Sequence, residues 1–560
     1  MTNCVVKKIY DYARKNPKKI ALSDGKSEIS FLDLCKQIEF AKLKLQNDCN
    51  LKKGDYLILA AKKEISFVNV YFACHLLQVV VIPIDVECNS NRLSYIVQNT
   101  RCNKSVGLTC SHSDLTNYSF SEFEGTLENF SFENTFFPKL TDVADLVFTT
   151  GTTGEPKGVL LTQKNISASS TNINQYIKNT EDDVELLALP ISHSFGLGRM
   201  RCALSNGQTL ILLGSFANIK RFFRYIEQFK VTGFGLVPSS FCLIKKLSGE
   251  KLFEYANQIK YIEIGSAPMC LDDKLELLEK MPKTRICMHY GLTEASRSTF
   301  LEFHEDRDNL LSIGKPSPNT SIKIFNSEGV EVQSCEKGEI CVLSDAVCSG
   351  YLNNETSNNN LFYGAYLRTG DLGQYINSKY IVLCSRIKEL INVGGKKVSP
   401  IEVEDALKSI KNIEDCACVG INDNILGEVV KYLPEHPYLY DPEIMTTEHL
   451  RDIFKEFIRE SIFENISDEI PYEADVIVNK VEEKPNVDVI KATIIVQKDT
   501  QKGMIIGKGA TAIKRIGRDA RMKIEKLTGK KCFLELFVSI KKGWTKDKEG
   551  LKALGYDVNL

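Results

Sequence analysis

The sequence predicts a multidomain α/β protein that ends in a separate, smaller α+β domain. Its 560 residues suffice for about three or four domains. Short β-branched runs alternate with helical stretches over residues 56–110 and 184–300, which is typical of a mainly parallel sheet. Residues 501–560 carry fifteen Lys and Arg against six Asp and Glu, although the whole chain has a net charge of −1. This basic end indicates a nucleic-acid or membrane-surface partner, or simply a solvated charged face.

The strands expected in the first 300 residues are short apolar runs. They are "YLILAA" (56–61), "VVVIPIDV" (79–86), "KSVGLTC" (104–110), "VELLALP" (184–190), "TLILLG" (209–214), "VTGFGLVP" (231–238) and "YIEIGSAP" (261–268). The most apolar window, Phe67–Val86, is interrupted by Asn69, His75 and Pro83. We therefore expect a buried helix that runs into a strand there, and no membrane span.

The amino-acid composition of the remaining chain changes several times. Residues 311–382 are rich in Gly, Asn and turn residues and are expected to be all-β. From Ser385 we expect a short β-turn-β followed by a helix over 400–410. The last part is expected to hold a charged helix (447–466), strands (474–482, 489–497), a glycine-containing loop, a basic helix, a strand (532–540) and a final helix.

The cysteines indicate a reducing compartment. Eighteen Cys are scattered without a CxxC pair and without grouping with the seven His. This distribution is unlike a disulfide framework or a zinc site and favours small buried side chains in the cytosol. The first residues, "MTNCVVKKIYDYARKNPKK", contain no apolar stretch of a signal peptide. A cytoplasmic protein without a transmembrane segment is expected.

The stretch "DLVFTTGTTGEPKGVLLT" (145–162) has the composition of a phosphate-binding loop. A strand-like run leads into three Gly, four Thr and one Lys, whose backbone N–H groups, hydroxyls and ammonium can all donate to phosphate oxygens. The stretch does not match the GxxxxGK[ST] pattern. Taken alone, a loop of this kind is more often a simple turn.

Six further motifs follow this loop in a fixed order. They are "LPISHSFGLG" (189–198), "IGSAP" (264–268), "HYGLTEAS" (289–296), "GEI" (338–340), "RTGDLG" (368–373) and "SRIKELINVGGKKVSPIEVE" (385–404). Together with "TTGTTGEPKG" (149–158), they closely resemble the acyl-adenylate-forming enzymes, over about residues 8–431. The resemblance implies a large domain of two α/β subdomains and a β-rich subdomain, followed by a small α+β domain.

The resemblance also implies a set of ATP- and Mg²⁺-binding residues. Thr293 would hydrogen-bond the α-phosphate, Glu294 would hold Mg²⁺ as a hard oxygen ligand, and Asp371 would accept the ribose hydroxyls with help from Arg386. The residues implied to bind ATP are Thr149, Thr150, Gly151, Thr152, Thr153, Gly154 and Lys157 around the phosphates, Ser266, Ala267, Pro268 and Tyr290 around the adenine, and Gly291, Thr293, Asp371 and Arg386.

Three further roles concern the acid, the thiol and the hinge. His193 would be a catalytic gate for acid or thiol, although a lone His is usually structural. Lys388 would be the hinge on which the small domain swings, although it could equally be a surface lysine. Gly394 and Gly395 would form the face for the thiol of coenzyme A or of a carrier-protein pantetheine. The carboxylic acid substrate would enter a mostly apolar pocket.

Four stretches near the C-terminus differ in character from the preceding motifs. They are "YLPEHPYLYDPEIMTTEHLRDIFKEFIRESIF", "EIPYEADVIV", "DTQKGMIIGKGATAIKRIG" and "GWTKDKEGLKALGY". From about residue 433 the chain therefore resembles a second family, the C-terminal part of the Era-type ribosome-assembly GTPases. The resemblance implies a type II KH domain, without the GTPase domain, that binds single-stranded RNA such as small-subunit rRNA. Ile505 and Ile506 are expected to be core residues, with Ile505 also lending an apolar floor to a base. The residues expected to contact RNA are Ile505, Gly507, Lys508, Gly509, Ala510, Lys514, Arg515 and Arg518.

Two departures from these families stand out. Ala510 occupies the second glycine position of the GxxG signature, where a left-handed backbone would disfavour it. The lysine-bearing "PKTxxGK"-like stretch that ends the small domain in the first family is missing. We expect a large domain over 1–384, a truncated small domain over 385–431, a connector over 432–472 and a KH domain over 473–560.

Three interpretations of the whole chain remain open. The first is an acid–thiol ligase, impaired by the missing lysine and joined to an RNA-binding module. The second is an RNA-binding protein whose nucleotide domain binds ATP or AMP without catalysis. The third is a gene-fusion chimera without a combined function.

Overall fold

The structure is a computed structural model of the chain. It describes residues 3–86, 88–149, 156–216, 218–332, 336–376, 379–393, 396–400, 403–404, 407, 418–423, 427–432, 450–465, 474–483, 487–528 and 531–540. These residues form two compact units, of which the first comprises 1–214, 223–241 and 253–437 and the second comprises 215–222, 242–252 and 438–560.

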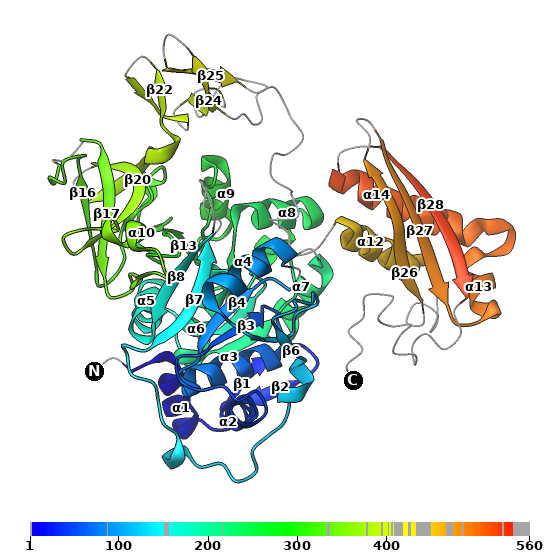
Figure 1. The fold of residues 1–560 in the computed structure, drawn as a ribbon. Coiled ribbons are helices and arrows are strands. Elements are labelled where there is room, and N and C mark those ends of the chain that lie inside the picture. The colour runs from blue at the N-terminus through cyan, green and yellow to red at the C-terminus, as the bar shows by residue number, and fades with distance from the viewer. Residues whose placement is uncertain are drawn as a thin grey trace. The chain divides into compact units, whose positions relative to one another are not determined.

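A seven-stranded sheet of the first unit contains the strands that flank the glycine-rich loop. Its order is β18-β8-β7-β4-β3-β5-β6, with parallel pairing from β7 to β6 and antiparallel pairing at the β8 and β18 edge. The bounds are β3 Tyr56–Ala60, β4 Val80–Ile84, β5 Lys104–Val106, β6 Thr116–Tyr118, β7 Val143–Thr149, β8 Lys157–Thr162 and β18 Gly350–Tyr351. The loop therefore joins β7 to β8 (Figure 1).

A second sheet of nine strands is parallel from β1 to β13 and antiparallel at its ends. Its order is β15-β14-β13-β12-β11-β9-β10-β1-β2. The bounds are β1 Ile20–Ser23, β2 Glu28–Ser30, β9 Val184–Leu187, β10 Thr209–Leu212, β11 Gly233–Leu236, β12 Tyr261–Ile264, β13 Arg285–Tyr290, β14 Thr299–Glu302 and β15 Lys315–Pro316. The prediction of mainly parallel α/β units is thus confirmed, including every strand expected from its apolar run.

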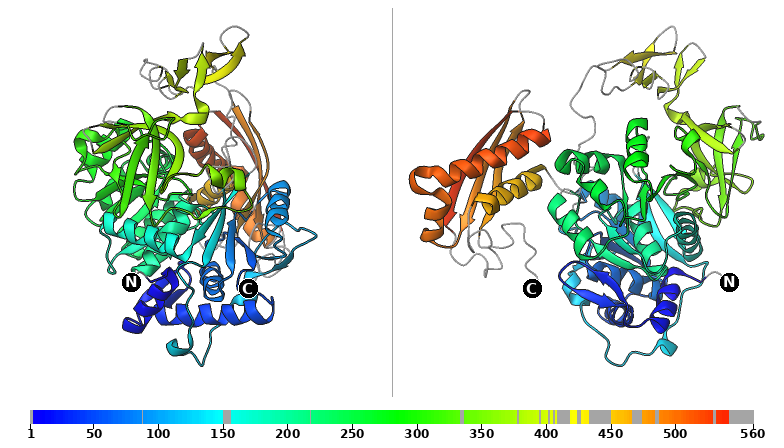
Figure 2. Two further views of the ribbon diagram at one scale, coloured as in Figure 1. Left: turned by 60° about the vertical axis from the view of Figure 1, so that its left-hand side comes forward. Right: turned by 180° about the vertical axis from the view of Figure 1, so that it is seen from behind.

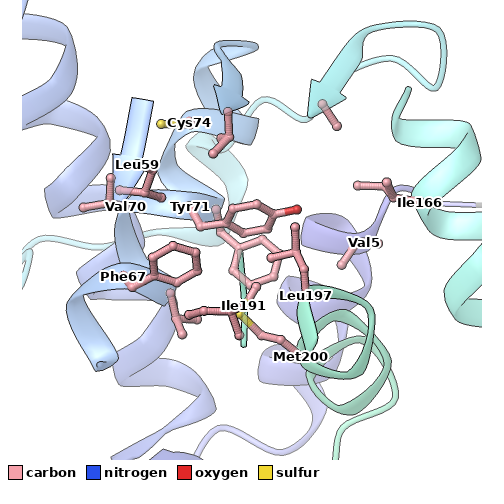
Figure 3. Close-up of a cluster of buried hydrophobic side chains, with 14 of the residues drawn as sticks. Val5, Leu59, Phe67, Val70, Tyr71, Cys74, Ile166, Ile191, Leu197 and Met200 are labelled. Atoms are coloured by element: carbon pink, nitrogen blue, oxygen red, sulfur yellow. The ribbon is translucent and has the colours of Figure 1, made fainter. Parts of the chain in front are cut away.

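Helices surround both sheets. They are α1 Val5–Lys15, α2 Phe31–Asn47, α3 Ile65–Leu77, α4 Ser90–Thr100, α5 Gln163–Ile177, α6 Ser194–Ser205, α7 Ile219–Gln228, α8 Pro238–Ser248 and α9 Leu271–Lys280. The core packs side chains of α1, β3, α3 and α6 together, with Phe67, Tyr71 and Met200 fully buried (Figure 3). Because every residue of α3 from Ser66 to Leu76 is buried, this helix is apolar all round.

This burial explains the apolar window Phe67–Val86, which is helix α3 followed by strand β4, as predicted. In the parts of the chain that the structure describes, no helix has both the length and the apolar character that crossing a membrane requires.

The β-rich region expected over 311–382 forms a third sheet. Its order is β16-β17-β20-β19, with β21 also paired to β20. The bounds are β16 Thr320–Phe325, β17 Gly338–Ser344, β19 Phe362–Tyr363, β20 Tyr366–Ile376, β21 Tyr380–Arg386 and the short helix α10 Glu355–Asn359. The following small sheet holds β22 Ile391–Val393, β23 Lys396–Val398, β24 Cys418–Asp423 and β25 Gly427–Tyr432. The helix expected over 400–410 lies largely outside the described residues.

The C-terminal part of the second unit packs helices on one face of a three-stranded sheet (Figure 2). The bounds are α12 Leu450–Asn465, β26 Asp475–Glu483, β27 Val487–Val496, α13 Asp499–Ile506, α14 Thr511–Thr528 and β28 Lys531–Ile540. Strand β27 lies in the middle, antiparallel to β26 and parallel to β28. Helix α13 was not expected from the residue pattern, and the expected final helix lies outside the described residues.

Candidate functional site

One part of the site joins the end of β13 to the β-rich sheet. The hydroxyl of Tyr290 donates to Asp371 Oδ2 at 2.7 Å. The other carboxylate oxygen, Oδ1, is buried and receives no hydrogen bond, although Arg386 Nε lies 3.2 Å from it. Burial raises the pKa of Asp371 even though Tyr290 and Arg386 oppose the change. A buried acceptor with spare capacity is suited to a hydroxyl-bearing ligand.

The "GEI" and "RTGDLG" motifs act together to position Asp371. Glu339 Oε1 accepts from the backbone N–H of Gly370 at 2.9 Å, and Glu339 Oε2 accepts from Arg368 Nε at 2.9 Å. Gly370 has φ +75°, a left-handed conformation that favours glycine. Thr369 Oγ1 accepts from the N–H of Asp371 at 3.1 Å and donates to Ile340 O. The carboxylate is therefore held by a tightly bonded turn.

The segment after β12 forms the neighbouring wall. Ser266 and Pro268 are exposed and Ala267 is half-buried. Ser266 has φ +72°, an uncommon conformation for a residue with a side chain and one that occurs frequently at functional sites. Gly265 is required sterically, because a Cβ there would lie 2.1 Å from the His289 ring.

In a second part of the site, Tyr351 contacts Lys157 with its ring face and Glu294 with its hydroxyl. The Tyr351 hydroxyl donates to Glu294 Oε1 at 2.7 Å. Lys157 Nζ lies 4.8 Å from the centroid of the Tyr351 ring and donates to Ser357 Oγ at 2.9 Å. Tyr351 was not among the residues expected from the sequence. The aromatic residue in "SGYLNN" was the available signal, but only the register of β18 on β8 shows its role.

Only some of the other residues expected at the phosphate site lie in the described part of the chain. Thr149 and Thr293 are half-buried and Gly291 is exposed. The expected ligands Thr150, Gly151, Thr152, Thr153 and Gly154 lie outside the described residues, as do Gly394 and Gly395.

His193 is the residue immediately before helix α6. Its side chain reaches solvent, and burial of the ring followed by the nearby Arg92 guanidinium lowers its pKa, against the opposing effect of Asp85. Arg297 fixes the start of the same helix, donating to Ser194 O and Phe195 O at 3.1 Å each. The imidazole therefore stands at the start of a helix whose first carbonyl groups are bonded by Arg297.

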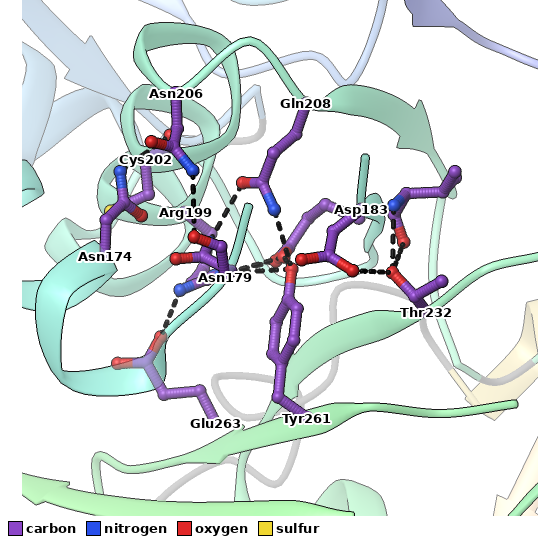
Figure 4. A network of polar contacts seen from close by, with 12 residues as sticks. Asn174, Asn179, Asp183, Arg199, Cys202, Asn206, Gln208, Thr232, Tyr261 and Glu263 are labelled. Atoms are coloured by element: carbon purple, nitrogen blue, oxygen red, sulfur yellow. Dashed lines mark hydrogen bonds and ion pairs between the residues drawn. The ribbon is translucent and has the colours of Figure 1, made fainter. Parts of the chain in front are cut away.

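Beneath this helix lies a buried network of charges that the sequence reasoning missed. Arg199 donates to Glu263 (Figure 4). It also donates to Glu185, which accepts a further hydrogen bond from the Tyr261 hydroxyl. Arg297 Nε lies 3.0 Å from Glu263. Burial raises the pKa of Glu263, but Arg297, Arg199 and His289 hold it well below its usual range. The signal was present as single glutamates within the apolar runs "VELL" and "YIEI".

Lys388 lies apart from these groups. It is exposed in a short 3₁₀ turn, Ile387–Glu389, that follows β21. Ser385, at the position where the resembling family usually has glycine, is fully buried and is the last residue but one of the same strand. An exposed residue between a buried strand end and a separate sheet has the location that a hinge needs.

The carboxylates of this site suit a magnesium ion that is coordinated mainly by the phosphates of a bound nucleotide. Among the described residues, no three His, Cys, Asp or Glu side chains gather in a way that could hold a metal ion. Glu294 offers one oxygen beyond the one bonded to Tyr351. Mg²⁺ is usually bound by one or two carboxylates plus substrate phosphates, so a single glutamate fits.

The C-terminal unit has its own candidate site at the turn between α13 and α14. Gly507 and Gly509 have φ +73° and +66°, and Ala510 has φ +60°. We expected alanine to be unfavourable at position 510 if the backbone there were left-handed. The φ of Ala510 shows that it is. Lys514, Arg515 and Arg518 are exposed on α14, and Arg518 pairs with Asp519.

The expectation that Ile505 is a core residue is confirmed. This side chain is completely buried in the core of α12, α13, α14 and the sheet. The added expectation of an apolar floor for a base was wrong, because a side chain packed in the core two residues before Gly507 presents no apolar surface to a ligand.

The fold and the first site together define an adenylate-forming α/β fold followed by a KH domain. Residues 9–352, more than half of the chain, match the AMP-binding enzyme family, and residues 469–545 match the KH domain family. The chain belongs to the AMP-binding enzyme family and carries a C-terminal KH domain.

Individual relatives support both assignments. A 2-succinylbenzoate–CoA ligase of Bacillus licheniformis is 28% identical over 457 residues, 79% of this chain and 91% of that protein. An o-succinylbenzoate CoA synthetase of Bacillus subtilis, solved with its acyl-adenylate intermediate, has 25% identity and a TM-score of 0.68, covering 80% of this chain and 91% of that chain.

The C-terminal relatives are GTPases of the Era type. GTPase Era of Campylobacter lari is 52% identical over 133 residues, which are 24% of this chain. The chain spans 46% of the length of that relative. It therefore shares the KH-bearing part of Era and less than half of the whole protein.

Proposed function

We propose that the first unit activates a carboxylic acid with ATP. The carboxylate attacks the α-phosphorus, the bond to the β-phosphate oxygen breaks, and acyl-adenylate and pyrophosphate form. In the second step a thiol, of coenzyme A or a carrier protein, displaces AMP and loses its proton. The buried, partly unbonded carboxylate of Asp371 beside Tyr290 carries this proposal, because it matches a ribose with two hydroxyl donors.

The residues have complementary roles in this scheme. Lys157 and the threonines and glycines of the loop from Thr149 onward bind the phosphates, and Thr293 donates to the α-phosphate. Ser266, Ala267 and Pro268 line the adenine with Tyr290. Glu294 holds Mg²⁺, which when bound neutralises charge on the departing pyrophosphate. His193 stands at the entrance for acid or thiol.

The choice of substrates is supported by the relatives. An o-succinylbenzoate CoA synthetase with 26% identity and a TM-score of 0.62 has been solved with a product analogue of the coenzyme A thioester. We therefore favour an aryl or acyl acid, and coenzyme A or a pantetheine carrier as acceptor. Lys388, Gly394 and Gly395 would bring the small domain to the thiol.

Ribose recognition tests this proposal. Wild-type protein should bind ATP about 10- to 100-fold more tightly than 2′,3′-dideoxy-ATP, because hydrogen bonds to a charged acceptor are worth about 1.5–3 kcal/mol. Asp371→Asn should reduce that preference to within about threefold, since an amide is a weaker acceptor. Calorimetry on the full chain measures both affinities, with the exposed Asp308→Asn as a control. A folded chain that binds no ATP would refute the proposal.

A second function is favoured by the turn between α13 and α14. We propose that the KH domain binds single-stranded RNA through backbone groups of Gly507 and Gly509 and through Lys508, Lys514, Arg515 and Arg518. The left-handed glycines and the exposed basic helix behind them support this, because such contacts go mainly to phosphates. The resemblance to the ribosome-assembly GTPases implies small-subunit rRNA as the target.

This RNA binding should be strongly salt-dependent. Affinity for a single-stranded RNA should fall steeply between about 50 and 200 mM salt, and Lys508→Asp with Arg515→Glu should abolish it. The control, Lys480→Glu with Lys531→Glu, changes the charge equally away from α14 and should preserve most of the affinity. Fluorescence anisotropy that responds neither to salt nor to the first pair would contradict the proposal.

Ala510→Gly should change the affinity for RNA in the opposite direction. A side chain in the left-handed region costs about 1–2 kcal/mol, while glycine costs about 0.4–1 kcal/mol through the unfolded chain. The exchange should therefore stabilise the domain slightly and tighten RNA binding. Ala520→Gly, in the buried middle of α14, should instead destabilise it by about 1 kcal/mol or more.

The two proposed functions belong to one protein only if the chain is one continuous polypeptide. Cleavage of native protein after Glu428 and Glu435 would release the peptide "VVKYLPE", which spans the join between the two regions. Its detection by mass spectrometry would exclude the interpretation that the fusion is an error in the gene prediction.

A further inference from the structure

Tyr351 lies in a segment that connects the two charged groups of the phosphate site. Its strand, β18, pairs with β8, with Tyr351 opposite Val159, two residues beyond Lys157. A few residues earlier, the N–H of Cys348 donates to the carbonyl of Glu294 at 2.8 Å, and Val347 bridges Ala295. The segment from Val347 to Tyr351 therefore runs from the backbone of the glutamate to the strand of the lysine.

Helix α10 holds this segment in place. Asn358 Oδ1 accepts from the N–H of Tyr351 at 2.7 Å, and Asn358 Nδ2 donates to the carbonyl of Tyr351 at 2.9 Å. Gly350 has φ +130°, and a Cβ there would lie 3.0 Å from Asn358 Oδ1. The neighbouring Ser357 accepts the hydrogen bond from Lys157. Backbone, ring and hydroxyl of Tyr351 are thus all constrained.

The ring separates opposite charges. Lys157 lies over the ring face, where the electron density attracts a cation, and Glu294 is bonded to the hydroxyl at the ring edge. Although both residues are described, no ion pair joins Lys157 to Glu294. A tyrosine hydroxyl is a donor at neutral pH, so Tyr351 can donate to the Glu294 carboxylate as observed.

We propose that Tyr351 is a positioning residue of the ATP–Mg²⁺ site. It binds one oxygen of Glu294, which leaves the other for the divalent cation, and it prevents Lys157 from pairing with that carboxylate before the phosphates arrive. The proposal rests on the function proposed above. Groups that orient a metal ligand typically change metal affinity by about 10- to 100-fold when they are removed.

The test is the strengthening of ATP binding by magnesium. The ratio of the dissociation constant for ATP in EDTA to that in saturating Mg²⁺ is measured by calorimetry on the full chain. Tyr351→Phe keeps the ring but removes the hydroxyl, and should lower this ratio about tenfold while leaving the EDTA value within about twofold. Tyr363→Phe, in strand β19, removes a tyrosine hydroxyl elsewhere in the same region and should leave the ratio unchanged.

A double-mutant cycle shows whether Tyr351 acts through the glutamate. In a Glu294→Gln background, Tyr351→Phe should no longer change the ratio. Asn358→Ala keeps the tyrosine but releases its backbone, and should lower the ratio to an intermediate degree; this variant also serves if Tyr351→Phe unfolds.

The outcomes separate this inference from the function on which it rests. If wild-type protein fails to bind ATP at all, the proposed function fails. If wild-type protein binds ATP with magnesium strengthening and Tyr351→Phe retains the full ratio, or loses affinity equally with and without magnesium, the positioning role alone is overturned.

Discussion

Arg199→Ala is expected to destabilise the adenylate-forming domain by about 3–5 kcal/mol, because it leaves two carboxylates buried without their cation. Arg199 is completely buried, as are its partners Glu185 and Glu263. Its Nε lies 2.7 Å from Glu185 and its Nη1 lies 3.1 Å from Glu263. The removed guanidinium also leaves a cavity beneath helix α6, which adds to the loss.

Urea unfolding followed by circular dichroism measures this loss as a lower midpoint. The control is Arg307→Ala, which removes an exposed arginine and should change the free energy of unfolding by no more than about 0.5 kcal/mol. A loss for Arg199→Ala below about 1 kcal/mol would show that water or neighbouring donors replace the guanidinium, and the buried network would then not be essential for stability.

The same network gives the effect a pH dependence. The pKa of Glu263 is held well below its usual range in the folded protein, against the opposing effect of burial. A depressed folded pKa stabilises the protein above the unfolded pKa of about 4.3, and that contribution is lost as the pH falls further towards the folded pKa. The difference between wild type and Arg199→Ala should therefore be full near pH 7 and shrink below about pH 4.

The sequence predicted the strands of the first unit because local composition determines them. Runs such as "TLILLG" are short and β-branched, and the structure places β10 there. It could not predict the partners of Glu185 and Glu263, because Arg199 meets them across 14 and 64 residues of sequence. Such pairs depend on how the strands are ordered in the sheet, which no local pattern encodes.

The residues of the candidate sites were likewise only partly predictable from the sequence. Asp371 could be identified from "RTGDLG", but its open oxygen and its bond to Tyr290 required the fold. Conversely, the departure at Ala510 was visible in the sequence, and the structure supplied the left-handed φ that makes it matter. For Ile505 the sequence correctly indicated a core residue, but it could not exclude a surface role, because a core side chain and an apolar floor are the same residue type.

The second large effect concerns the rate of acyl-adenylate formation. We expect pyrophosphate release to be about 10²–10³ slower than in a protein of this family with a complete small domain, because one preorganised cation is missing. As the carboxylate attacks, negative charge builds on the α-phosphate oxygens. Lys157 and Glu294 with its Mg²⁺ act mainly at the leaving pyrophosphate, so they do not replace a lysine that bridges the acid and the α-phosphate.

We propose that the loss is specific to the first half-reaction, because only the stretch that carries the bridging lysine is absent from the sequence. Strands β22 to β25 end at Tyr432, and the sequence beyond them contains no "PKTxxGK"-like stretch. The segment "INVGGKKVSP", on which the thiol step depends, precedes β24 and is present in the sequence. Preformed acyl-adenylate should therefore be discharged to coenzyme A more readily than it is made.

Acid-dependent pyrophosphate release by the full chain, tested on a panel of aryl and fatty acids, measures the defect. Replacing the residues after Lys431 with the corresponding C-terminal segment of the Bacillus subtilis o-succinylbenzoate CoA synthetase should raise the rate about 10²–10³-fold. Lys455→Ala and Lys508→Ala should leave the slow rate unchanged, because productive geometry tolerates little misplacement. Turnover of about one per second or faster by the unaltered chain would place it among ordinary enzymes, and a bridging lysine would then be dispensable for the first half-reaction in this protein.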